Sequence, residues 1–306
     1  MVLVVFNYKS KFVKIDCDLF SLNHKVIEHD LYLENYKNIL PKMIKSKVIV
    51  FWFLSFKTLP LIILAKILGK RICVLSGGYD ISNIKGYGMF SNNFNKFFQK
   101  IQFSLSSIVM VNSLSSYNEL LQRMPSLINK LFWQYHALAL NPIKINSEKR
   151  NIDFITIGTL KKVNMKRKGI ETFIDYAKKY TDKVFYLVGP IIDKELLSLF
   201  PKNVKVTGFI DEIEKNKLLL NSKYYSQDSE HEGFGLSVLE AQLYGCHILY
   251  NPVYALNEVV LNGTKMTENF KYDNHYTGNN ILKELNQKFC IVKRRYALEA
   301  MINTHF

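Results

Sequence analysis

The segment 229–246, SEHEGFGLSVLEAQLYGC, gives the clearest indication of the fold. Gly233 and Gly235 flank one aromatic residue, Phe234, and glycines at this spacing allow a tight turn that a ligand can approach closely. Helical periodicity begins at about Leu236, so free backbone N–H groups and the positive end of the helix dipole point at whatever occupies the turn. The segment therefore predicts a glycine turn and a helix N-terminus that bind an anion, most simply a phosphate.

Two glutamates stand on either side of this turn. Glu232 precedes it, while Glu240 lies about one turn inside the helix, on the face of Ser237 and Tyr244. A carboxylate can accept hydrogen bonds from sugar or ribose hydroxyls, worth about 1.5 to 3 kcal/mol each. An isolated glutamate is more often a solvated residue, but here the glycine turn, the helix start and the spacing occur together. This combination favours a ligand-binding role for both carboxylates.

The rest of the chain alternates short apolar β-rich runs with helical periodicity, the pattern of a doubly wound parallel sheet. In the first half we expect strands near residues 2–6, 25–28, 47–53, 71–76 and 107–112, and helices near residues 58–69 and 93–106. The second half repeats the pattern. We expect strands in DFITIGTL, KVFYLVGP, NVKVTGF, KYYSQ and HILYNP, and helices in KGIETFIDYAKKY, DEIEKNKLLLNS and LSVLEAQLYG.

The polar stretch 141–151, NPIKINSEKRN, suits a linker between two domains. We therefore predict an α/β protein with Rossmann-like domains at 1–148 and 149–284, and a helix at about 285–306 that packs back on the first domain. Because ligands of such sheets bind at the carboxyl ends of the strands, two facing domains would hold a ligand in a cleft between them.

Composition limits the partners. The 306 residues carry a formal net charge of +15 with a mean hydropathy of −0.02, which describes a soluble globular protein that attracts anions. No nucleic-acid-binding motif accompanies the basic residues, so we expect no nucleic-acid partner. The four scattered cysteines predict neither a zinc site nor a disulfide framework, and they suit the cytoplasm.

The apolar run 48–69 is interrupted by Lys57, Pro60 and Lys66. This favours a strand, a loop and a core helix over a membrane span, although such a helix could also lie on a bilayer surface.

The motif HEGFGLSVLEA (231–241), followed by GCHILYNPVYALNEVV (245–260), resembles the nucleotide-sugar site of the retaining glycosyltransferases of family 4. The likeness covers roughly residues 150–262, and it implies the two-lobed GT-B fold. In that family the first glutamate lies beside the transferred hexose and the second binds the ribose. The resemblance thus assigns these roles to Glu232 and Glu240, and it assigns sugar and diphosphate binding to the backbone of Gly233, Phe234, Gly235 and Leu236.

A second stretch, ITIGTLKKVNMKRKGIETF (155–173), resembles the strand end and helix start whose basic residues hold the donor diphosphate in that family. Gly158 and Lys168 match the family pattern, whereas Thr159 stands where the family has an arginine. The resemblance implies that diphosphate binding is weaker here, or that the missing charge comes from Lys161, Lys162 or Arg167.

The first half resembles the family's acceptor domain through KRICVLSGGYDISNI (70–84) and IVMVNSLSSYNELL (108–121). The residues expected to face the cleft are Gly77, Gly78, Tyr79 and Asp80. His136, in YHALALN, is a weaker acceptor-side candidate, because a lone histidine is more often structural.

The resemblance implies a hexosyltransferase that takes a UDP- or GDP-linked sugar and transfers the hexose, with retention, to a glycan or lipid-linked acceptor. Lys168 would stabilise charge on the leaving diphosphate and Glu232 would orient the hexose, so we expect neither a metal nor another cofactor. A basic acceptor domain suits an anionic or lipid-linked acceptor, so we expect a cytoplasmic protein with peripheral contact at the inner face of a membrane.

Three alternatives stay open. Asp16 and Asp18 form an Asp-x-Asp tripeptide of the kind that binds metal in the other glycosyltransferase architecture, although such a tripeptide is common by chance. The same GT-B fold could serve a sugar-nucleotide epimerase, which product analysis would reveal. A nonenzymatic basic module would bind nucleic acid or an anionic membrane even after mutation of Glu232 and Glu240.

Overall fold

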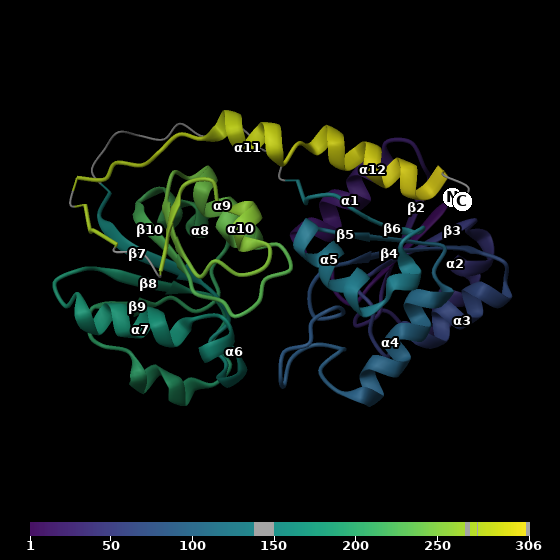
Figure 1. Cartoon of the computed structure of the whole chain (residues 1–306), viewed down its shortest axis with the longest axis horizontal. Coiled ribbons are helices and arrows are strands. Elements are labelled where there is room, and N and C mark those ends of the chain that lie inside the picture. The colour runs from purple at the N-terminus through teal and green to yellow at the C-terminus, as the bar shows by residue number, and fades with distance from the viewer. Residues whose placement is uncertain (138–149, 267–269, 274, 304–306) are drawn as a thin grey trace. The chain divides into compact units, whose positions relative to one another are not determined.

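The computed structural model describes residues 1–137, 150–266, 270–273 and 275–303. It divides into two compact units, which we call unit 1 (Met1–Ala139 with Lys288–Phe306) and unit 2 (Leu140–Gln287). The predicted boundary at 148/149 and most of the predicted linker fall outside the described residues. In the sequence, unit 2 is thus inserted between the two segments of unit 1 (Figure 1).

Unit 1 is built on a parallel sheet of six strands in the order β2-β1-β3-β4-β5-β6. Its strands are β1 (Val2–Phe6), β2 (Val26–Asp30), β3 (Val48–Trp52), β4 (Arg71–Ser76), β5 (Ile108–Val111) and β6 (Leu131–Trp133). Its helices are α1 (Lys11–Ser21), α2 (Ile39–Lys45), α3 (Leu59–Ile67), α4 (Asn93–Leu105), α5 (Leu114–Arg123) and α12 (Ile291–Asn303), with short 3-10 turns at Tyr36–Asn38 and Pro125–Leu127.

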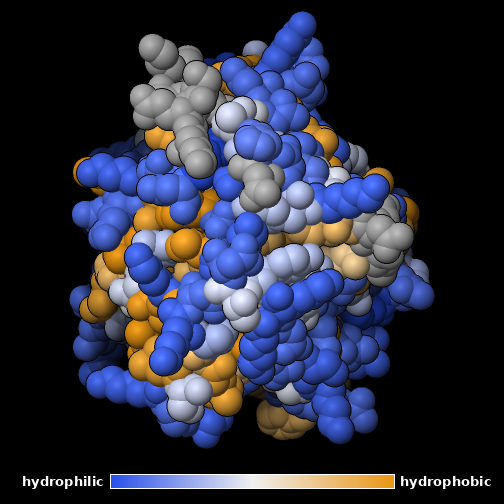
Figure 2. All heavy atoms as spheres, turned by 90° about the vertical axis from the view of Figure 1, so that its left-hand side faces the viewer, coloured by the Kyte–Doolittle hydropathy of each residue, from blue (hydrophilic) through white to orange (hydrophobic). Residues whose placement is uncertain are grey.

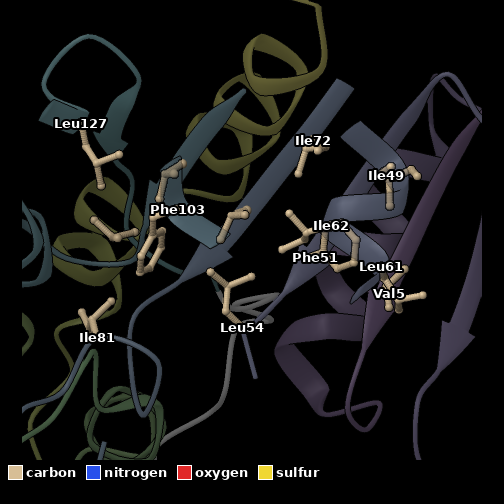
Figure 3. Close-up of a cluster of buried hydrophobic side chains, with 14 of the residues drawn as sticks. Val5, Ile49, Phe51, Leu54, Leu61, Ile62, Ile72, Ile81, Phe103 and Leu127 are labelled. Atoms are coloured by element: carbon tan, nitrogen blue, oxygen red, sulfur yellow. The ribbon is translucent and has the colours of Figure 1, made fainter. Parts of the chain in front are cut away.

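Helices cover both faces of this sheet, which explains why its strands are continuously apolar rather than alternating. Leu3 and Val5 of β1 point into a core formed with α2, α3, α4 and α5, where side chains such as Leu61, Ile62 and Phe103 meet the sheet (Figure 3). Val2, Val4 and Phe6 point into the opposite core, formed with α1 and α12. Successive side chains of a strand therefore fill two different cores.

Helix α12 is fixed to unit 1 by a buried ion pair. The guanidinium of Arg294 is 0% exposed and donates two hydrogen bonds to Asp16 of α1, from Nε to Oδ1 at 3.0 Å and from Nη2 to Oδ2 at 2.6 Å. Its Nη1 donates to Asn112 Oδ1 at 3.2 Å and to the carbonyl of Gln134 at 3.0 Å. Trp52 Nε1 completes the set with a 3.0 Å bond to Asp16 Oδ2. One C-terminal side chain therefore joins α1 to the carboxyl ends of β5 and β6.

Unit 2 is built on a second parallel sheet of six strands, in the order β12-β11-β10-β7-β8-β9. Its strands are β7 (Ile152–Ile157), β8 (Phe185–Val188), β9 (Val204–Val206), β10 (Ser222–Gln227), β11 (His247–Tyr250) and β12 (Gly263–Lys265). Its helices are α6 (Lys162–Arg167), α7 (Ile170–Lys179), α8 (Glu212–Leu220), α9 (Leu236–Leu243), α10 (Leu256–Val259) and α11 (Leu282–Lys288), with a 3-10 segment at Lys194–Leu199. The surface of unit 2 that Figure 2 shows is mainly hydrophilic, with hydrophobic residues gathered on part of it.

These sheets confirm the predicted α/β architecture of two Rossmann-like units. The strands and helices expected from the alternation are present within one to three residues of their predicted bounds, while the short edge strands β6 and β12 were not predicted. The apolar run 48–69 forms β3, a loop and α3, as expected. Among the described helices, none is long and apolar enough to span a bilayer.

Candidate active site

In unit 2 the candidate site lies where the strand order reverses. Strands β7 and β10 are neighbours in the sheet, and the chain leaves them in opposite directions across it, toward β8 and β9 on one side and β11 and β12 on the other. In open parallel sheets the carboxyl ends of such strands form the ligand site. The loop at Gly158 follows β7, and the loop with Glu232 follows β10, so both predicted motifs meet at this point.

Glu232 is held in a polar cluster. Its side chain is 12% exposed and forms an ion pair with the ammonium group of Lys168. Its Oε1 also accepts hydrogen bonds from Ser229 Oγ at 3.0 Å and Gln227 Nε2 at 3.2 Å. Burial alone would raise the pKa of Glu232, but Lys168, Ser229 and the nearby charge of Arg167 outweigh it and lower that pKa. The carboxylate is therefore ionised at neutral pH.

A glycine lets Lys168 reach this carboxylate. Gly169 has φ +70° between α6 and α7, and a Cβ there would lie 2.5 Å from the carbonyl oxygen of Asp228. No other residue fits such close contact between the α6–α7 junction and the loop after β10. The backbone N–H of Glu230 ties the same two segments together by donating to the carbonyl of Arg167 at 3.0 Å.

Of the basic residues proposed to replace the family arginine, the structure brings Arg167 to the cluster. Arg167 Nη2 donates to Asn164 Oδ1 at 2.5 Å, and Asn164 Nδ2 donates to the carbonyl of Thr159 at 2.9 Å. Lys162, by contrast, is 71% exposed and pairs with Glu195 at 2.9 Å, and Lys161 is also exposed. Positive charge near Glu232 thus comes from Lys168 and Arg167.

The glycine turn and the helix that follows it form as the sequence predicts. Gly235 has φ +91° and is the N-cap of α9, whose first residue is Leu236. A Cβ on Gly235 would come within 3.1 Å of Leu256, so both the backbone conformation and the packing call for glycine. Gly233 and Phe234 are buried beside it.

Glu240 lies in the second turn of α9 and is not a solvated helix residue. It is 8% exposed, and its Oε2 lies 2.8 Å from the ammonium nitrogen of Lys215 on α8. Lys215 also contacts Glu212 Oε1 at 2.8 Å. Glu240 and Glu232 thus have different basic partners.

The expected acceptor-side residues of unit 1 separate into exposed and buried ones. Tyr79 is 47% exposed and packs edge-on against Tyr87. Gly77 has φ +142°, and a Cβ there would lie 2.8 Å from Asn112 Nδ2. Gly78 follows in the same loop, and its N–H donates to Asp80.

Asp80, the fourth residue expected to face the cleft, lies in the interior of unit 1. Its side chain is fully buried and accepts hydrogen bonds from the backbone N–H groups of Gly77 at 3.2 Å, Gly78 at 3.1 Å and Leu54 at 3.3 Å. Burial raises the pKa of Asp80 above its usual value, against the opposing effect of these bonds and of Ser76. Asp80 therefore shapes the glycine loop from within.

His136 and Asp16 are also interior residues. His136 is 4% exposed and stacks on Trp52 with ring centroids 5.4 Å apart, next to Phe12. Burial, followed by the charge of Arg294, lowers the pKa of His136 well below its usual range, so the ring is neutral. Asp16 is bonded to Arg294, while Asp18 is 63% exposed and pairs with Lys14, so the Asp-x-Asp residues do not converge on one site.

Sequence reasoning missed Gln227, Ser229 and Lys215. Gln227 is the last residue of β10, where the strand order reverses. A polar residue at that place in a parallel sheet indicates a ligand site, so the sequence offered a signal for Gln227. Lys215 gave no such signal, because only the packing of α8 beside α9 brings it to Glu240.

Comparison with known families agrees with the geometry of unit 2. Residues 151–275 match the model of the family described as glycosyl transferases group 1. The matched range covers Lys168, Glu232 and Glu240.

Solved structures of similar fold span nearly the whole chain. The Anabaena protein Alr3699/HepE, solved with UDP-glucose, has a TM-score of 0.71 at 14% identity, with 99% of each chain covered. The lipopolysaccharide outer core galactosyltransferase WaaB has a TM-score of 0.63 at 11% identity, again over 99% of each chain. Sucrose-phosphate synthase from Thermosynechococcus elongatus has a TM-score of 0.62 at 14% identity, over 99% of this chain and 95% of that one. At these identities the likeness shows the fold, which is GT-B.

A curated relative, an uncharacterized 41.2 kDa protein in the cps region of Klebsiella pneumoniae, is 29% identical over 161 residues. The match spans 47% of this chain and 42% of the relative. Residues 151–275 of unit 2 are therefore similar to group 1 glycosyl transferases, within a chain that has the GT-B fold.

Proposed function

We propose that the protein is a retaining glycosyltransferase that moves a hexosyl group from a nucleoside-diphosphate sugar to a glycan or lipid-linked acceptor. The observation that carries this proposal is the cluster of Lys168, Arg167 and Glu232 at the strand-order reversal of unit 2, beside the glycine turn that begins α9. It combines cations for a diphosphate with a carboxylate for hydroxyl groups.

In this proposal the donor diphosphate lies against Lys168, Arg167 and the backbone from Gly233 to Leu236, with Gly158 and Thr159 beside it. As the bond between the sugar and the diphosphate breaks, negative charge grows on the diphosphate. Fixed cations and N–H groups then stabilise the transition state more than the ground state. Because two side-chain cations are available for this charge, we propose that no metal is required.

Glu232 orients the hexose through its hydroxyls, and Glu240 holds the ribose. Both are ready hydrogen-bond acceptors, since each is largely buried and fixed by a lysine. We assign acceptor binding to Gly77, Gly78 and Tyr79 of unit 1. Retention of configuration follows from the family resemblance, with the leaving phosphate assisting removal of the acceptor proton.

The similar proteins suggest which donor and acceptor to test first. HepE was solved with UDP-glucose, WaaB is named for the lipopolysaccharide outer core, and the Klebsiella relative lies in a cps region. We therefore propose UDP-hexoses as donors and surface-glycan precursors as acceptors. We further propose that the protein acts in the cytoplasm, in peripheral contact with the inner face of a membrane.

The test is ligand-dependent thermal stabilisation with UDP-glucose, UDP-galactose and GDP-mannose, in the presence of a chelator. We expect one sugar nucleotide to stabilise the wild type and to lose this effect in Glu240→Ala. Glu214→Ala, an exposed glutamate on α8, is the matched control and should respond as the wild type does. Absence of any shift in the wild type would refute the donor site.

Product analysis with the stabilising donor then separates the remaining activities. Transfer gives free nucleoside diphosphate together with a glycosylated acceptor. An epimerase would instead change the sugar without any acceptor, and that result would exclude the proposed transfer.

A further inference from the structure

One surface of unit 1 is both apolar and strongly basic. Helices α3 and α4 pack side by side over the same sheet face, and Leu61, Ile62 and Phe103 point from them into the core (Figure 3). Five apolar side chains, four on these helices and one in the loop just before α3, are 42% to 76% exposed. We call them the α3–α4 face: Phe56, Ile63, Ile67, Phe94 and Phe97.

The aromatic residues of this face are contiguous. Phe56 lies just before α3, with its ring centroid 6.0 Å from Phe94 and 6.1 Å from Phe98 on α4. Phe98 in turn lies 4.9 Å from Phe94 and 5.3 Å from Phe97. The side chains of Phe94 and Phe97 stay 67% and 61% exposed within this cluster. An apolar patch formed by neighbouring helices marks an interaction site more often than scattered exposed residues do.

The side chains of Tyr32 and Leu33, in the loop after β2, extend the patch. Lys57, next to Phe56 in the sequence, stacks over the ring of Tyr32 at 3.7 Å from its centroid. Tyr32 is 69% exposed and Leu33 beside it is 86% exposed. The apolar surface thus continues onto the loop after β2.

The charge of this region is one-sided. Residues 31–105 contain eleven lysines and arginines but only two acidic residues, Glu34 and Asp80. Asp80 is fully buried and Glu34 is paired with Lys42 at 2.5 Å, so neither offsets the basic surface. Lys66 on α3 and Lys96 and Lys100 on α4 lie on the same helices as the exposed apolar side chains.

We propose that the α3–α4 face binds the surface of an anionic lipid bilayer. Exposed aromatic and branched apolar side chains insert at the boundary of headgroups and acyl chains, and flanking lysines contact anionic headgroups. A nucleic acid could bind the lysines through its phosphates, but it would not bury the apolar side chains of Ile63 and Ile67. A lipid surface satisfies both the apolar and the basic groups.

This surface deepens the proposed function, because it would bring unit 1 to a lipid-linked acceptor, yet the binding itself does not depend on the donor site. Full-length protein should float with vesicles made of equal parts phosphatidylglycerol and phosphatidylethanolamine, and should not float with phosphatidylcholine alone. The Glu240→Ala variant should float as the wild type does. Loss of donor binding and loss of membrane binding are therefore separable results.

The decisive variant is Phe94→Ser combined with Phe97→Ser. We expect it to lose at least about tenfold in vesicle affinity while its thermal unfolding stays close to that of the wild type. The matched control is Val292→Ser with Tyr296→Ser on α12, which covers the opposite face of the same sheet; these residues are 47% and 62% exposed. The control should bind vesicles normally.

Three results would overturn the proposal. Equal flotation of the phenylalanine variant and the wild type would show that this face does not contact lipid. A wild-type dimer in solution that the same variant dissociates, without vesicle binding, would make the face a contact between copies of the chain. Binding to a single-stranded oligonucleotide that disappears in the variant, again without vesicle binding, would make the ligand a nucleic acid.

Discussion

Lys215 and Glu240 form an ion pair of 2.8 Å between α8 and α9, with side chains only 12% and 10% exposed. The pair fixes the carboxylate that the proposed function assigns to the ribose, and it keeps that carboxylate from rotating freely. If Glu240 holds the ribose as proposed, Lys215 is a positioning residue for donor binding.

We predict that Lys215→Met weakens affinity for the donor about tenfold, because Glu240 loses the partner that orients it. Titration calorimetry with the stabilising sugar nucleotide measures this change. Lys217→Met, an exposed lysine on the same helix, is the control and should leave the affinity unchanged. Equal effects of the two substitutions would argue against positioning by Lys215.

Glu232→Gln should lower kcat/KM by about two orders of magnitude, since the amide keeps the shape of the side chain but loses the charge that strengthens its hydrogen bonds. The comparison is Glu230→Gln, two residues away, whose side chain is 38% exposed and pairs with Lys166. Initial rates of product formation with both variants test this. If Glu230→Gln is equally impaired, the effect belongs to the loop and not to the Glu232 carboxylate.

The two aspartates of the Asp-x-Asp tripeptide should differ sharply in their contribution to stability. Asp16→Asn leaves the buried guanidinium of Arg294 without its counter-charge, so we expect a loss of about 3 kcal/mol or more in the free energy of unfolding. Asp18→Asn removes only an exposed pair with Lys14 and should change it by less than about 1 kcal/mol. Denaturant unfolding of both variants gives the comparison, and similar losses would contradict the assigned role of Arg294.

Glycines 169 and 69 have nearly the same backbone, with φ +70° and +63°, but different surroundings. A Cβ on Gly169 would meet the Asp228 backbone at 2.5 Å, whereas a Cβ on Gly69 meets nothing within 4 Å. Gly169→Ala should therefore cost about 1 to 3 kcal/mol more than Gly69→Ala and should also weaken donor binding, because it displaces Lys168 from Glu232. Thermal unfolding with and without donor measures both effects, and equal losses would remove the steric argument.

The pH dependence of the free energy of unfolding should depend on the protonation of His136. Because the folded pKa of His136 is well below 6.5, the unfolded chain binds a proton below about pH 6.5 while the folded protein does not. His136 therefore lowers the free energy of unfolding as the pH falls, by about 1.4 kcal/mol between pH 7.5 and pH 5.5. His136→Phe should flatten the curve by that amount, and His275→Gln, at an exposed site, should not. An unchanged slope in His136→Phe would mean that the pKa of His136 is the same in the folded and the unfolded chain, contrary to the effect expected from its burial.

The sequence predicts most of the fold, because strands buried on both faces are continuous apolar runs such as Val2–Phe6, and these alternate with helical periodicity. The glycine turn before Leu236 was also predictable, since only a few residue types adopt its backbone. The Glu232–Lys168 contact joins residues 64 positions apart, and only the family resemblance placed both at one site. The inward orientation of Asp80 and the pairing of Asp16 with Arg294 have no local signal, because they arise from packing between distant elements.

The Arg294–Asp16 pair has a consequence for synthesis of the chain. These residues are 278 positions apart, so Asp16 emerges from the ribosome long before its partner exists. Until α12 is made, α1 carries a carboxylate that cannot be buried without a large cost, and the sheet of unit 1 lacks one of the two helices that cover one of its faces. Unit 2, whose residues are contiguous, can complete its core first. We therefore expect maturation of the nascent chain to proceed from the middle outward, with the first-made unit the last to close.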